Sequence, residues 1–177
     1  MNPQIRKYWA IIVHFGSPEP TNASLDAMYG GVDHLDGVII VNNSKEDFQT
    51  TNHPRCTTVN PGKNLGYAGA IRVGLGALVA QGVNPSDIVI CMNNDVLVGD
   101  NTIADVKEWW SDHSSPALLG IPTIEGGKEF SGLGRVNFFS GRALVQPSGV
   151  TEQPQNIFSM NYIHGAIFSA PYSLLLN

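Results

Sequence analysis

Cysteine is scarce in this sequence, and so is positive charge. The 177 residues include 2 cysteines, Cys56 and Cys91, and 10 lysines and arginines against 15 acidic residues. Two cysteines so far apart form neither a CxxC motif nor a disulfide framework, so we expect both to be reduced and Cys91 to fill the core. A net charge of -5 without a basic run argues against nucleic acid as a partner.

Long hydrophobic runs are also missing. No apolar segment reaches the roughly 18 residues that suggest a membrane span, and the N-terminal region has no small-residue cleavage site after its short apolar stretch. We therefore expect a cytoplasmic protein without a membrane span, either free or peripheral at the inner face of the membrane. The length favours a single domain over residues 1–177, and 42% hydrophobic residues argue against disorder.

Apolar segments alternate with helical patterns along the chain. The patterns predict strands at 8–15, 37–44, 56–60, 87–92 and 116–124. They also predict three helices: a short one whose cap lies near Thr21 to Ser24, one over 65–82 and one over 101–110. The apolar positions of the second helix are Leu65, Ala68, Ile71, Leu75, Leu78 and Val79, with Asn64 as its cap and Gly82 as its stop. Strands that are apolar throughout, alternating with helices, predict an α/β fold with a mainly parallel sheet. Residues 125–154 predict a hairpin or a loop over the sheet.

Polar clusters follow three of these strands, in "HFGSPEP", "NNSKED" and "MNNDVLVGD". Ligands bind beyond the carboxyl ends of the strands in an open parallel sheet. Asn93 and Asp95 are two residues apart, so their oxygens can point to one side of an extended segment. Such oxygens suit Mg²⁺ or Mn²⁺, which take further ligands from water and substrate phosphates. An Asx-turn that ends the strand is the alternative, and the local residues alone favour it.

The helix expected at 65–82 contains four glycines: Gly66, Gly69, Gly74 and Gly76. Each costs roughly 1 kcal/mol relative to alanine, so something should offset the cost. Gly66 and Gly69 can let the backbone approach a ligand, and Gly74 and Gly76 can let the helix lie close on the sheet. The helix start and Lys63 suit an anionic group such as a diphosphate. Close packing alone is an equally good explanation.

In order and spacing, these segments resemble the family 2 glycosyltransferases of the GT-A fold, particularly their rhamnosyltransferase-like branch. The resemblance runs through "VIIVNNSKED", "NPGKNLGYAGAIRVGLGAL", "IVICMNNDVLV" and "YIHGAIFSAPYSLL". It implies a Rossmann-type, mainly parallel sheet with a small hairpin-like C-terminal part. It also implies an inverting, metal-dependent enzyme of polysaccharide biosynthesis that moves a sugar, rhamnose among the candidates, from a dTDP- or UDP-sugar to a glycan or lipid-linked acceptor.

The resemblance also assigns roles by position. It implies that Asp95 binds Mg²⁺ or Mn²⁺, with Asn93 in the first position of a D-x-D-type motif. The donor-binding residues that it implies are His14, Asn42, Asn43, Ser44, Lys63, Asn64, Gly66 and Asn94. On the acceptor side it implies His164 and Gly165, followed by Ala166.

Two departures from the family pattern matter. Asn42 stands where the family usually has aspartate, which leaves the nucleoside preference open. The chain ends at Asn177, before the acidic motif that supplies the family's general base, so the catalytic residue is not assigned. The final "YSLLLN" is consistent with a truncated chain or with an oligomer that packs through this aliphatic run. Two alternative functions stay open: a nucleotidyltransferase, disfavoured because "HFGSPEPT" has no lysine or arginine, and a donor-binding module without activity.

Overall fold

The computed structural model describes residues 6–48, 53–113, 117–137, 142–147, 162–163 and 165–176. Within these residues the main sheet has six strands in the order β3-β2-β1-β4-β10-β5. The parallel strands are β1 (Tyr8–His14), β2 (Gly37–Asn42), β3 (Cys56–Val59) and β4 (Ile88–Asn93). The antiparallel strand β10 (Ile167–Pro171) joins β4 to the short strand β5 (Leu119–Gly120). The predicted mainly parallel α/β fold is confirmed.

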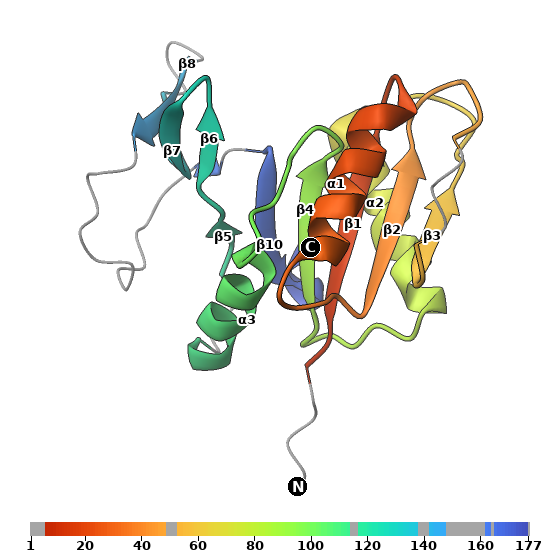
Figure 1. Ribbon diagram of the computed structural model, residues 1–177, viewed down its shortest axis with the longest axis horizontal. Coiled ribbons are helices and arrows are strands. Elements are labelled where there is room, and N and C mark those ends of the chain that lie inside the picture. The colour runs from red at the N-terminus through yellow and green to blue at the C-terminus, as the bar shows by residue number, and fades with distance from the viewer. Residues whose placement is uncertain are drawn as a thin grey trace, which may run out of the picture.

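Helices cover both faces of this sheet (Figure 1). Helix α1 (Pro18–Gly30) lies on one face and α2 (Gly66–Ala80) on the other, while α3 (Thr102–Asp112) lies near β5 and α4 (Tyr172–Leu175) follows β10. Alternate residues of β1 point to opposite faces, so the protein has two cores. Ala10 and Ile12 pack with residues of α1 and α3, whereas Ile11 and Val13 pack with residues of α2.

The two helices beside β1 differ in detail from the sequence prediction. Helix α1 begins at Pro18 rather than near Thr21, because proline suits the first helical position and its missing N–H is not needed there. In α2 the buried positions are Ala70, Ile71, Gly74, Leu75 and Leu78. Ala68 and Val79 were wrongly placed on the buried face. They lie on the flank of the helix, about a quarter turn or more from the centre of the buried stripe, and are exposed.

The glycines of α2 do not share one purpose. A Cβ on Gly74 would lie 2.6 Å from Cγ2 of Ile11, so the predicted close approach of helix to sheet is confirmed there. A Cβ on Gly76 would meet nothing within 4 Å, and the packing prediction for that residue is wrong. Gly66 has a φ of 67°, in the left-handed region that favours glycine. Gly82, which follows the helix with a φ of 75°, is the stop that the sequence predicts.

A second, smaller sheet contains β6 (Thr123–Glu125), β7 (Lys128–Asn137), β8 (Arg142–Pro147) and β9 (Tyr162–Ile163). Strands β7 and β8 form the predicted hairpin. The single strand predicted at 116–124 is wrong, because the chain leaves the main sheet after β5 and enters the small sheet at β6. Pro122, between them, has no N–H for a ladder. Figure 1 shows the small sheet beyond β10 and β5, at the end toward which β4 runs.

The remaining observations concern individual side chains and the membrane. Cys91 is fully buried and unpaired, as predicted, and burial raises the pKa of its thiol to about 12, so it stays protonated at neutral pH. Of the adjacent Trp109 and Trp110, the second is buried and donates its indole N–H to Ser169. No helix in the described part of the chain is long and apolar enough to cross a membrane.

Candidate functional site

The order of the strands creates a crevice at the carboxyl ends of β1 and β4. The chain proceeds from β1 to β2 and β3 on one side, then crosses back and places β4 on the other side of β1. Such a reversal is the switch point where open α/β sheets bind ligands. The register sets His14 beside Asn42 and Val13 beside Asn93. The polar clusters that follow these three strands therefore meet at one edge of the sheet.

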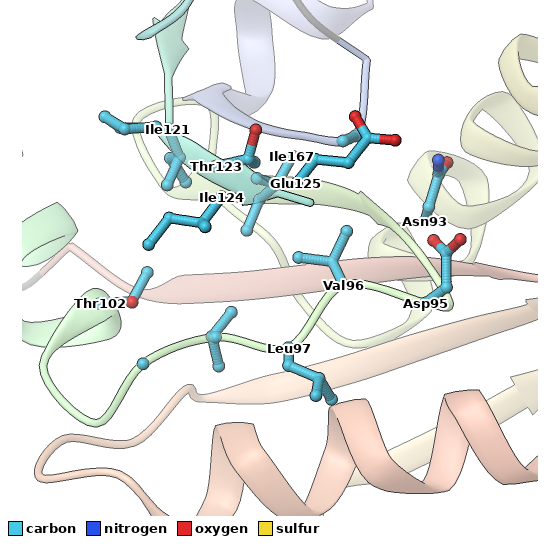
Figure 2. A pocket seen from close by; sticks show the side chains of 14 residues that line it. Asn93, Asp95, Val96, Leu97, Thr102, Ile121, Thr123, Ile124, Glu125 and Ile167 are labelled. Atoms are coloured by element: carbon cyan, nitrogen blue, oxygen red, sulfur yellow. The ribbon is translucent and has the colours of Figure 1, made fainter. Parts of the chain in front are cut away.

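A cavity of about 770 Å³ opens on the β4 side of this edge. We call it the Asp95 cavity; its lining residues are Asn93, Asp95 to Gly99, Thr102, Ile121 to Glu125, Ala166 and Ile167. Figure 2 shows the side chains of Asn93 and Asp95 next to each other at one end, with the Glu125 carboxylate extending on the same side of the view. The cavity thus joins the end of β4 to the beginning of α3, to β6 and to the beginning of β10.

Asn93 ends β4, whereas Asn94 and Asp95 belong to the turn that follows it, so the extended segment that the sequence predicts stops at Asn93. Asn93 and Asp95 both line the cavity, as the sequence spacing predicts, and the Asp95 side chain is exposed. Asn94 lies apart from them, because its Nδ2 donates to the Phe15 carbonyl at 3.1 Å and to Oγ1 of Thr21 at 3.2 Å. The predicted metal-binding pair is therefore brought together, while Asn94 contacts the loop after β1 and helix α1.

The donor set at Asp95 limits the kind of cation that would fit. Among the described residues there is no group of three or more histidine, cysteine, aspartate or glutamate side chains that could hold a metal ion. A closed protein cage of the structural zinc type is therefore not formed by these residues. One carboxylate and one carboxamide oxygen match a magnesium or manganese ion, which keeps water and takes further ligands from substrate phosphates.

A second cavity, of about 710 Å³, lies beside β1 and β2. We call it the His14 pocket; its lining residues are His14, Gly16, Ser17, Pro18, Glu46, Asp47 and Phe48. The His14 ring stacks on Phe48 with 4.0 Å between ring centroids. Burial lowers the pKa of His14, which favours a neutral imidazole at pH 7. The pocket therefore combines a buried aromatic pair with the Glu46 and Asp47 carboxylates.

Sequence reasoning missed Glu46, Asp47 and Phe48. They follow the polar end of β2 directly, in "NNSKEDF". The signal that could have revealed Phe48 is an aromatic residue placed at the end of a polar cluster, close to a strand end. Its contact with His14 joins the end of β1 to a loop more than 30 residues later, and no local pattern specifies such a pairing.

Asn42 and Ser44, predicted to bind the donor, hold the loops around the His14 pocket. Nδ2 of Asn42 donates to the Glu46 carbonyl at 2.8 Å and to Oδ1 of Asn60 at 3.0 Å, and its Oδ1 accepts the Ser44 N–H at 3.0 Å. The Ser44 hydroxyl accepts the Gly16 N–H at 2.8 Å. Asn42 and Ser44 are both buried. Their polar atoms make these contacts within the protein itself.

Asn43 and Asn64 tie the end of β2 to the beginning of α2. Oδ1 of Asn43 accepts the Leu65 N–H at 2.7 Å, and its Nδ2 donates to Oδ1 of Asn64 at 3.0 Å. The same Asn64 oxygen accepts the Gly66 N–H at 2.8 Å. The N-cap of α2 is Leu65, however, so the cap predicted at Asn64 is one residue too early. The amides of Leu65 and Gly66 are therefore already bound. An anion at this end of α2 would meet later amides and the exposed Lys63.

The segment predicted on the acceptor side also reaches this edge of the sheet. Ala166 lines the Asp95 cavity and its carbonyl accepts the Asn93 N–H at 2.9 Å. Gly165 precedes it and is half-buried. His164 lies outside the described residues. The "GA" part of this segment is thus adjacent to the predicted metal-binding pair.

Comparison with known proteins identifies the fold. No protein-family model matches the chain, and no curated protein has significant similarity to it. A 4-diphosphocytidyl-2C-methyl-D-erythritol synthase structure is 17% identical, with a TM-score of 0.51, 81% of this chain covered and 73% of that chain. The mannosyltransferase PcManGT from Pyrobaculum calidifontis, solved with GDP-Man and Mn²⁺, is 18% identical, with a TM-score of 0.51 and 68% of this chain covered.

TarS from S. aureus is 15% identical, with a TM-score of 0.51 and 67% of this chain covered. The chain spans only 36% of the TarS chain and 36% of the mannosyltransferase chain. At these identities the likeness concerns the fold alone. The chain therefore has a GT-A-like α/β fold, which it shares with the mannosyltransferase and with the 4-diphosphocytidyl-2C-methyl-D-erythritol synthase.

Proposed function

We propose that this chain is a glycosyltransferase domain that binds a nucleotide-diphosphate sugar with Mg²⁺ or Mn²⁺. The observation that carries the proposal is the pairing of Asn93 and Asp95 in one cavity at the switch point of the sheet. Residues that end a central strand at such a point are placed to meet a ligand. The reaction proposed is transfer of the sugar, with inversion, to a glycan or lipid-linked acceptor, and dTDP-rhamnose is the donor that the sequence pattern favours.

In this proposal the two cavities bind different parts of the substrates. The His14 pocket, with its aromatic pair, suits the nucleoside, and the Asp95 cavity suits the diphosphate, the sugar and the acceptor. The strand β1 separates β2 from β4 and contributes to the edge between the cavities. A donor that lies across this edge would place its base near Phe48 and its diphosphate near Asp95. The exposed Lys63 side chain, just before the beginning of α2, would offset the negative charge of the phosphates.

In the transfer step the acceptor oxygen bonds to the anomeric carbon as the bond from that carbon to the diphosphate oxygen breaks. The acceptor proton passes to a base, which these residues do not identify. Asp95 and Asn93 would hold the cation, which supplies positive charge to the departing diphosphate. The protein's own contribution would be to fix these two oxygen ligands beside the cavity proposed for the acceptor.

Nucleotidyl transfer is the second candidate, and the fold likeness to the 4-diphosphocytidyl-2C-methyl-D-erythritol synthase over 81% of the chain is compatible with it. A nucleotidyltransferase must neutralise a nucleoside triphosphate, usually with a basic loop after its first strand. The segment after β1, "FGSPEPT", which includes the first turn of α1, has neither lysine nor arginine. A third candidate function is a donor-binding module without activity, which needs the two cavities but no catalytic base.

The test is a titration with dTDP and with UDP, each with and without Mn²⁺, on the wild type and on Asp95→Ala. Asp95→Ala removes the carboxylate that would hold the cation, and the diphosphate then loses its positively charged partner. We therefore expect this substitution to weaken the Mn²⁺-dependent binding by about tenfold or more. Asp105→Ala is the matched control, since Asp105 is exposed on α3 and is not part of the cavity lining. A wild type that binds neither nucleotide in a Mn²⁺-dependent way would contradict the proposal.

Product analysis then separates the candidates. Release of nucleoside diphosphate from a dTDP- or UDP-sugar in the presence of an acceptor indicates glycosyl transfer. Release of pyrophosphate from a nucleoside triphosphate and a sugar phosphate indicates nucleotidyl transfer. Binding without either product indicates a donor-binding module.

A further inference from the structure

Two hydroxyl groups of α1 are buried where the amphipathic pattern calls for apolar residues. Thr21 and Ser24 are each 0% exposed and three residues apart, so they occupy one face of the helix. A buried hydroxyl destabilises a protein unless it is hydrogen-bonded. The partners of these two should therefore explain why the helix has them.

Both hydroxyls bind the turn that carries Asp95. Oγ of Ser24 lies 2.9 Å from the Asn94 carbonyl and 2.7 Å from the Val96 carbonyl, so its proton is shared between the residues on either side of Asp95. Oγ1 of Thr21 accepts a hydrogen bond from Nδ2 of Asn94 at 3.2 Å. The turn around Asp95 is thus attached to α1 by two bonds to backbone carbonyls and one to the Asn94 side chain.

This attachment holds the chain where the backbone hydrogen bonds between strands have ended. Strand β4 stops at Asn93, so the following turn is not held by strand pairing. Helix α1 is itself fixed in the core through the buried side chains of Leu25 and Met28. The hydroxyls therefore transmit the rigidity of the core to the turn, on the side away from the cavity, and leave the Asp95 carboxylate directed into the cavity.

Thr21 also connects the two cavities. Its Oγ1 lies 2.6 Å from Nδ1 of His14, which lines the His14 pocket, and the same oxygen binds Asn94 beside Asp95. Asn94 adds a second link by donating to the Phe15 carbonyl, immediately after His14. The floor of one pocket and the turn of the other are thus parts of one hydrogen-bonded unit.

We propose that Ser24 and Thr21 are positioning residues that set the place of Asp95 relative to the His14 pocket, so that one donor can occupy both cavities. The ligand part of this inference rests on the proposed function, since it concerns a nucleoside diphosphate and its cation. The tether itself exists without ligand. Its value to the site is preorganisation, because a small misplacement of a binding group costs much of its effect.

Hydrogen exchange in the free protein tests the tether. In Ser24→Ala, which removes the shared proton donor, we expect the backbone amides of residues 95–98 to exchange about tenfold faster while those of β1 and α2 keep their rates. Ser111→Ala is the matched control, because it removes an exposed serine hydroxyl on α3. Unchanged exchange at residues 95–98 in Ser24→Ala would overturn the proposal.

Nucleotide binding tests the consequence for the site. In Ser24→Ala and Thr21→Val we expect the gain in UDP or dTDP affinity on adding Mn²⁺ to fall by about fivefold or more. In Ser24→Ala, which leaves the contact between Thr21 and His14 intact, we expect the affinity measured without Mn²⁺ to stay within about twofold of the wild type. Thr21→Ser keeps the hydroxyl but is smaller, and it should retain the Mn²⁺-dependent gain in nucleotide affinity. A role of the side-chain volume alone would predict the opposite order, with Thr21→Val retaining the gain. Ser24→Ala supplies the measurement should Thr21→Val fold poorly.

The outcomes separate the two proposals. A wild type without a Mn²⁺-dependent gain contradicts the proposed function and, with it, the positioning of a ligand by these residues. A wild-type gain that persists in both Ser24→Ala and Thr21→Val contradicts the positioning role alone.

Discussion

Replacement of Gly74 by alanine should destabilise the protein, although alanine forms helices better than glycine. A Cβ at this position would lie 2.6 Å from Cγ2 and 3.0 Å from Cδ1 of Ile11. Ile11 is fully buried in the central strand β1 and is β-branched, so its side chain has little freedom to move aside. The helix gains about 1 kcal/mol from alanine, and overpacking of a core costs about 1–3 kcal/mol. We expect a net loss of up to about 2 kcal/mol.

Gly76→Ala provides the control in the same helix. Its Cβ would meet nothing within 4 Å, so only the helix propensity changes and the protein should gain about 1 kcal/mol. Urea unfolding followed by circular dichroism measures both free energies of unfolding, with equal m-values as the sign of an unchanged unfolding transition. If Gly74→Ala proved as stable as Gly76→Ala, the close approach of α2 to β1 would be refuted.

Two further predictions concern buried ionisable groups. The Asp87 carboxylate accepts the backbone N–H groups of Lys7 and Asn84 and the indole N–H of Trp9. Because Asp87→Ala leaves these donors without their partner, it should lower the free energy of unfolding by about 2 kcal/mol or more. Urea titrations measure this change, and a loss below about 1 kcal/mol would contradict the assigned role. Burial lowers the pKa of His14 below its usual 6.5, so the unfolded chain binds a proton that the folded chain does not. The stability contributed by neutral His14 is present above pH 6.5 and is lost as the pH falls toward the lowered pKa; urea midpoints measured from about pH 5 to 8 should show this slope in the wild type and less of it in His14→Phe.

Much of the architecture was predictable because its signals are local. The apolar runs that became β1, β2 and β4 alternate with helical patterns, and this order alone predicts a parallel sheet covered on both faces. The boundary between β5 and β6 was not predictable. Leu119 and Thr123 belong to one apolar stretch of sequence, yet the chain changes sheets between them, and hydrophobicity does not specify which sheet a short strand joins.

The candidate site divides in the same way. Side-chain alternation predicts that Asn93 and Asp95 point to one side, and the structure places both in one cavity. The same polar pattern could not distinguish a ligand-binding carboxamide from a structural one. Asn42 and Asn43 look alike in sequence, but each is engaged by a different loop, because alternate residues at the end of β2 face opposite sides of the sheet.

The sequence by itself determined the fold class, the polar strand ends and the spacing of Asn93 and Asp95, because burial, turns and alternation are properties of neighbouring residues. Only the tertiary structure decided which groups those strand ends meet. Ser24 reaches the Asn94 carbonyl across 70 residues of sequence, and His14 stacks on Phe48. Such pairings depend on how α1 and the loop after β2 pack on the sheet, since a hydroxyl or an aromatic ring accepts many partners and packing selects one.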